Sequence, residues 1–124
     1  MTTLNAVTPL SETGYGANAV RTARDAEYDI LSRVTRLLKQ SDRTGRSADT
    51  VMAVHKNNQL WTIFASDLAD PQNGLADEIK AGLLSLAGFS LRHGHAVLSG
   101  SATTDALIDI NMSIMKGLRG EADI

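Results

Sequence analysis

The fold of this chain is decided first by residues 30–38, which read Ile-Leu-Ser-Arg-Val-Thr-Arg-Leu-Leu. Apolar side chains recur there at steps of three and four residues, which is the spacing of one face of an amphipathic α-helix. The basic residues Arg33 and Arg36 lie mostly off that face. The pattern predicts a helix that begins near Ala17 and ends before a loop at residues 41–47.

Three further segments of the chain carry a similar helical pattern. One begins at Ser47 or Asp49, either of which can cap it, and ends before Pro71, because the residue before proline disfavours helical geometry. The next covers residues 76–98, and a last one ends around residues 117–120. No stretch of useful length alternates with a period of two. The fold class is therefore all-α, a small bundle of about four amphipathic helices with short loops.

The domain organisation follows from length and composition. The 124 residues suit one domain, and 43% of them are apolar while only 4% are aromatic, which suits packed helices better than a sandwich. Residues 1–16 are rich in Thr, Ser and Gly and predict a flexible N-terminal arm. Residues 17–120 are expected to form a single helical domain.

Charge and hydropathy exclude several classes of function. The net charge is −2, and no basic cluster is present to neutralise a row of phosphates, so no direct binding of nucleic acid is expected. The first ten residues lack the features of a signal peptide. The most apolar stretch, residues 81–91, is too short to span a bilayer. We therefore expect a soluble cytoplasmic protein that does not insert into membranes.

The side chains that carry catalysis or bind metals form no convincing site in this sequence. The chain has no cysteine, which excludes disulfides and thiolate ligands. His93 and His95 are two residues apart, so on a helix they point about 200° away from each other and cannot share a metal. Asp67 and Asp70 are better explained by capping and solvation than as paired catalytic carboxylates. We expect no enzyme activity, no catalytic residues, no metal site and no cofactor.

Asparagine inside helical patterns is the most unusual feature of the chain. Asn57 lies one turn from Trp61, the only tryptophan, and Asn111 lies in a Leu/Ile stripe. A buried amide without a partner costs about 1–3 kcal/mol, so these side chains are expected to make specific contacts. Two interpretations are equally open: the group recognises a partner, or Trp61 is a core residue and the asparagines hold corners of the bundle together.

Four short blocks, in a fixed order, carry a resemblance to a known family. They are Arg24-Asp25-Ala26-Glu27-Tyr28, Asn57-Asn58-Gln59-Leu60-Trp61, Asp70-Pro71-Gln72-Asn73-Gly74-Leu75 and the segment from Leu107 to Leu118. Over roughly residues 15–118 the chain resembles the flagellar FlaF family of alphaproteobacteria. It departs from the family pattern at Ala23, where proline is frequent, and at Asn58, where arginine is usual.

The resemblance implies a function and a set of contact residues. FlaF-like proteins act in the cytoplasm as flagellin-binding, chaperone-like factors that promote flagellin synthesis and secretion, opposite the translational regulator FlbT. The expected ligand is a terminal amphipathic helix of flagellin, held in a groove between helices. The alternative is a post-transcriptional regulator that acts through FlbT or flagellin mRNA. The expected partner-binding residues are Arg24, Glu27, Tyr28, Asn57, Leu60, Trp61 and Asn111. Arg24 and Glu27 are three residues apart and are interpreted as a surface pair.

Overall fold

The computed structural model describes residues 14–44 and 46–118, with side chains from residue 25 onward. Within these residues the chain forms four helices and no strand: α2 (Gly14–Gln40), α3 (Ala48–Ala69), α4 (Asp77–Leu98) and α5 (Asp105–Leu118). The prediction of a small all-α bundle with short loops is confirmed.

The first helix is longer than the sequence pattern indicates. It begins at Gly14, so residues 14–16, which the composition predicts as part of the flexible arm, are helical. No proline stands between Pro9 and Pro71, so nothing in the sequence blocks the backbone hydrogen bonds of these added residues. Residues 1–13 lie outside the described part of the chain, and the division into an arm and a domain otherwise stays a prediction.

Both ends of α3 are fixed by local side-chain chemistry. The Ser47 hydroxyl accepts a hydrogen bond from the backbone N–H of Thr50 at 3.1 Å, which identifies Ser47 as the cap. At the other end Asp70 leaves the helical region with φ −67° and ψ 129°, as expected before Pro71. The turn that follows is held by Asn73, whose side-chain amide donates to the backbone carbonyl of Asp67 at 3.1 Å.

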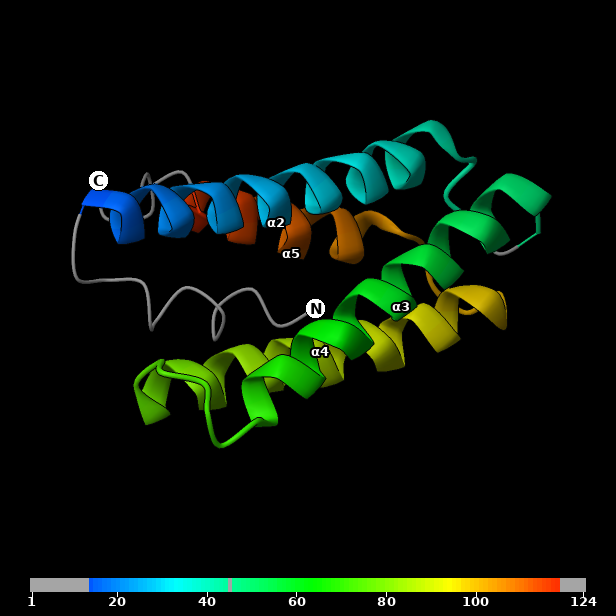
Figure 1. Cartoon of the computed structure of the whole chain (residues 1–124). Helices are drawn as coiled ribbons and strands as arrows, with labels where there is room; N and C mark the ends of the chain where they lie inside the picture. The colour runs from blue at the N-terminus through cyan, green and yellow to red at the C-terminus, as the bar shows by residue number, and fades with distance from the viewer. Residues whose placement is uncertain (1–13, 45, 119–124) are drawn as a thin grey trace.

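The helices are arranged as two pairs (Figure 1). Helix α2 lies along α5, and α3 lies along α4, with further contact between α2 and α3 and between α4 and α5. All four helices contribute to the hydrophobic core between the pairs. Its buried members are Leu31, Val34, Leu38, Ala53, Val54, Leu60, Val97, Leu107 and Ile108.

Helix α4 buries only the second half of the face that its sequence pattern predicts. The spacing of Ile79, Leu83, Leu86, Ser90 and Val97 predicts one core-facing stripe, but Ile79 is 52% exposed and Leu83 is only half-buried. The buried positions are Ala87, Ser90, Gly94 and Val97. Gly94 is the position of close helix approach, because a Cβ atom there would collide with the Asn58 side chain of α3. The second half of α4 therefore packs tightly, while its first half keeps apolar side chains accessible.

Candidate functional site: a polar link beside an apolar groove

A chain of hydrogen bonds joins three helices in the interior. The Trp61 indole N–H donates to Asn111 Oδ1 at 2.9 Å, and Asn111 Nδ2 donates to Asn57 Oδ1 at 2.8 Å. Asn57 Nδ2 in turn donates to Ser90 Oγ at 3.3 Å. Residues Asn57, Ser90 and Asn111 are 0% exposed and Trp61 is 1% exposed. We call these four residues the polar link; it connects α3 to α5 and to α4.

Burial gives the polar link its strength. Each of its amide groups has found a partner inside the protein, and an interior hydrogen bond replaces one that would otherwise be made with water. Leaving one of these buried atoms without a partner costs about 1–3 kcal/mol. Since hydrogen bonds are directional, the link fixes where α5 and α4 sit relative to the middle of α3.

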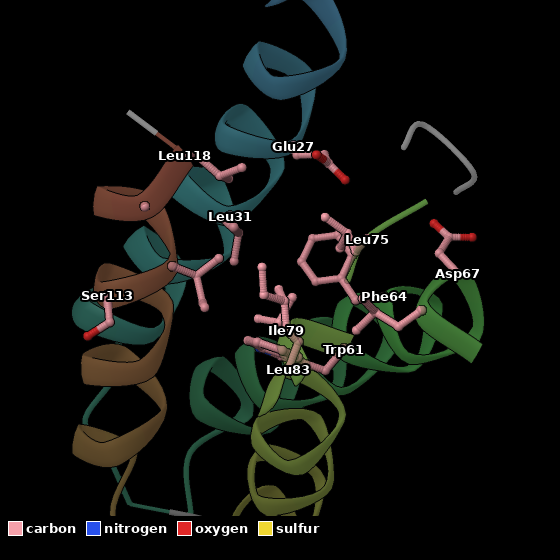
Figure 2. Close-up of a pocket in the computed structure, with 13 residues that line it drawn as sticks. Glu27, Leu31, Trp61, Phe64, Asp67, Leu75, Ile79, Leu83, Ser113 and Leu118 are labelled. Atoms are coloured by element: carbon pink, nitrogen blue, oxygen red, sulfur yellow. The ribbon is translucent and has the colours of Figure 1, made fainter. Parts of the chain in front are cut away.

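Next to the polar link the two helix pairs enclose an apolar cavity of about 460 Å³, which we call the groove (Figure 2). The groove is lined by Glu27 and Leu31 of α2, by Trp61, Phe64, Asp67 and Leu68 of α3, by Leu75, Ile79 and Leu83 on and before α4, and by Ser113, Ile114, Gly117 and Leu118 of α5. Trp61 belongs to both features, because its indole N–H bonds to Asn111 and its ring lines the groove. Within the groove the ring meets Phe64 edge-on, with centroids 5.6 Å apart.

The position of the groove follows from the register of the helices. Along α5, Leu107 and Ile108 lie in the packed core, Asn111 in the link, and Ile114 and Leu118 at the groove. The same order of core, link and groove is found along α4 when the helix is followed from its C-terminus to its N-terminus. The polar link therefore lies between a closely packed half of the bundle and a half that keeps an accessible apolar hollow.

Among the residues that the structure describes, the two charged side chains that line the groove are both acidic. Glu27 is 5% exposed and Asp67 is 7% exposed, and in Figure 2 both side chains lie at the margin of the apolar lining. Burial raises the pKa of the Asp67 carboxyl above its usual range, and the neighbouring Asp70 carboxylate acts in the same direction. The groove is therefore apolar with a negative rim.

The matching family model is that of the flagellar protein FlaF, and it covers residues 13–118. The chain belongs to the FlaF family. No curated protein and no solved structure matches it. Membership of the FlaF family places this protein in flagellar biology and confirms the resemblance seen in the sequence.

The structure brings some of the predicted contact residues of this FlaF-family chain to the groove and separates others. Trp61 and Glu27 line the groove, whereas Leu60 is a core residue and Tyr28 is half-buried on α2. Glu27 is not on the surface as expected, because it lies one turn before the core residue Leu31 on the same face of α2. The side chain of Arg24 lies outside the described part of the chain.

The structure shows the hydrogen-bond partners of Asn57 and Asn111. Asn57 and Asn111 are fully buried and bonded to each other, which is the arrangement expected of residues that hold helices together. Direct contact between these amides and a bound partner stays a prediction, and it requires the interior to open.

Several groove residues are absent from the set that sequence reasoning selected. They include Phe64, Asp67, Leu75, Ile79 and Leu83. Ile79 and Leu83 carried a usable signal, since they are four residues apart on α4, but periodicity alone does not distinguish a core face from an accessible one. In the described residues, no three His, Asp or Glu side chains are grouped to hold a metal ion, and no helix has the length and apolar character needed to cross a membrane.

Proposed function

We propose that this FlaF-family protein binds flagellin in the cytoplasm as a chaperone-like factor and so promotes its synthesis and secretion. The bound segment is a terminal amphipathic helix of flagellin, whose apolar face enters the groove. Binding of this kind needs neither catalysis nor a cofactor, since it consists of the burial and later release of apolar surface.

The observation that carries the proposal is the accessible apolar wall of the groove. Ile79 is 52% exposed although it lines the same hollow as Trp61 and Phe64. Amphipathic helices bind other proteins by laying one apolar face into such a groove. The volume of about 460 Å³ lies in the range of ligand sites in proteins, roughly 300–1,000 Å³.

The polar link has a supporting part in this proposal. By fixing α5 and α4 relative to α3, it keeps the groove walls apart when no partner is bound. A groove that exists before binding loses less conformational entropy on binding than one that must form.

The test is co-purification with flagellin, using two matched surface substitutions. Ile79→Asp places a carboxylate in the groove wall and should lower the affinity for flagellin at least roughly tenfold, because the apolar contact is replaced by a charge that must be desolvated. The change is compatible with the helix, since Ile79 lies in the first turn of α4, where the helix dipole favours an acidic side chain.

Met52→Asp is the control, because Met52 is 56% exposed on α3 and does not line the groove. It should leave flagellin binding unchanged. Equal flagellin retention by both variants would contradict binding at the groove. A mobility shift with flagellin leader RNA, together with no retention of flagellin, would instead favour the regulatory alternative.

A further inference from the structure

Asp67 is a buried acidic residue of the groove. It is 7% exposed and lines the groove near the end of α3. Its backbone carbonyl accepts from Asn73, which fixes the position of the residue. Its carboxylate forms no hydrogen bond or ion pair with any residue of the described ranges. An ionised carboxylate in such a setting is unfavourable until a cation or donor reaches it.

The described residues that line the groove add negative charge around Asp67. Glu27 lines the same groove from α2, and Asp70 lies three residues further along the chain. None of the described residues that line the groove is basic. Burial is the main cause that raises the pKa of Asp67; the positive charge of the chain's N-terminus acts in the opposite direction, and the Asp70 carboxylate adds to the rise.

We propose that the groove selects amphipathic helices that carry an arginine or lysine at the edge of the apolar face, and that Asp67 binds this cation. The inference rests on the proposed function, since it specifies the chemistry of the segment that the groove holds. The apolar face lies against Phe64 and Ile79, and the cationic side chain reaches the carboxylate at the rim.

The chemistry of long basic side chains suits this arrangement. Their hydrocarbon stems pack along apolar surface while the charged group extends to a polar site. Phe64, three residues before Asp67 on α3, and Leu75 offer apolar surface in the same groove. An arginine can also form two parallel hydrogen bonds with one carboxylate, which lysine cannot do. The pair therefore adds selectivity to an interaction that burial alone would leave unspecific.

The experiment compares synthetic amphipathic helices of about five turns that differ at one residue. The apolar face is constant, and the flanking residue is arginine or glutamine, placed in the first, middle or last turn in separate peptides. Affinity is measured by fluorescence anisotropy with the full chain as wild type, Asp67→Asn and the control Asp29→Asn. Asp29 is exposed on α2, on the side away from Glu27.

The wild type should prefer one arginine peptide over its glutamine counterpart by roughly tenfold, the value expected for one charge-assisted hydrogen bond. Asp67→Asn should bring this ratio close to one, and Asp29→Asn should leave it unchanged. Exchanging the two charges gives a second test. The Asp67→Lys variant should bind a peptide with glutamate at that position more tightly than the glutamine peptide. Thermal melting followed by circular dichroism checks that each variant is folded.

The failures of the two proposals are distinguishable. If the wild type binds arginine and glutamine peptides equally, the cation proposal is overturned while helix binding at the groove stands. If neither the peptides nor flagellin bind, the proposed function fails and this inference fails with it. If the wild type dimerises in sedimentation and Ile79→Asp abolishes the dimer, a second copy of the chain occupies the groove and the inference is also overturned.

Discussion

The polar link and the groove are adjacent parts of one interior with opposite chemistry. In the link, buried amide, indole and hydroxyl groups bond to one another across three helices. In the groove, apolar side chains face a hollow of about 460 Å³, and the Asp67 carboxylate has no bonding partner in the described residues. Apolar packing alone is non-directional and tends to close such a hollow. The comparison indicates that directional hydrogen bonds hold the helices where the hollow stays open.

Trp61 belongs to both regions, so its removal should have the largest effect. Trp61→Ala deletes a fully buried ring and leaves Asn111 Oδ1 without its donor, and we expect a loss of about 3–5 kcal/mol in the free energy of unfolding. Urea unfolding followed by circular dichroism measures this. Phe64→Ala is the comparison within the groove and should cost less, because Phe64 is only half-buried. Equal losses would mean that the link adds nothing to the burial of the indole.

The asparagines of the link should show a smaller, coupled effect. Asn57→Ala and Asn111→Ala should each lower the free energy of unfolding by about 1–3 kcal/mol. The double variant should lose less than the sum, because the two changes remove the same bond between Asn111 Nδ2 and Asn57 Oδ1. Urea unfolding of the four proteins completes the double-mutant cycle.

Asn58 is the matched control for that cycle. Its Oδ1 atom is buried without a hydrogen-bond partner in the described part of the protein, so Asn58→Ala should cost less than either change in the link. If Asn57→Ala and Asn111→Ala instead left stability intact and weakened flagellin binding, the asparagines would be recognition residues.

Two glycines of α4 offer a smaller test of the same contrast. Gly82 lies in the half of α4 next to the groove and has open space where a Cβ would stand, so Gly82→Ala should stabilise the protein by up to about 1 kcal/mol. At Gly94 the new Cβ would collide with Asn58, and Gly94→Ala should gain less or lose stability. Melting temperatures of both variants decide the matter, and the reverse order would mean that the packed half is looser than the geometry indicates.

The pH dependence of Asp67 should be the most modest effect, and its sign is defined. Burial raises its folded pKa above the unfolded value of about 3.9, so the native state holds the proton more tightly. Wild-type stability should therefore fall relative to Asp67→Asn as the pH rises from about 3.9 through the raised pKa, and the difference should then stay constant. Melting temperatures of both proteins across this range provide the measurement.

Asp42 should behave in the opposite way and serves as the control. The Thr50 hydroxyl and the backbone N–H of Thr44 bond to its carboxylate and lower its pKa. The wild type should accordingly be more stable than Asp42→Asn above about pH 3.9, and this advantage should be lost as the pH falls through the lowered pKa. A common sign for both aspartates would show that the two environments do not differ as described.

The sequence predicts the helices better than it predicts the faces they bury. Ser47 and Asp70-Pro71 determine the ends of α3 through local backbone chemistry, so both are readable from the chain alone. The burial of Asn57, by contrast, depends on Asn111, which lies 54 residues away. The accessible position of Ile79 depends on how far apart the helix pairs lie, and no local pattern encodes that distance. The family resemblance predicts a groove between helices, and the unusual residues of the chain are recognisable, but most of the residues that line the groove are not.

The pairing of the helices has a consequence for how the chain folds. Helices α3 and α4 follow each other and are joined by a short turn, so their pairing closes only a small loop. Helix α2 pairs with α5, and that contact must wait until the whole intervening chain has been made. During synthesis on the ribosome, Trp61 and Asn57 therefore remain without Asn111 until α5 emerges. Helix α5 completes the interior, so a nascent chain without α5 has an unfinished core.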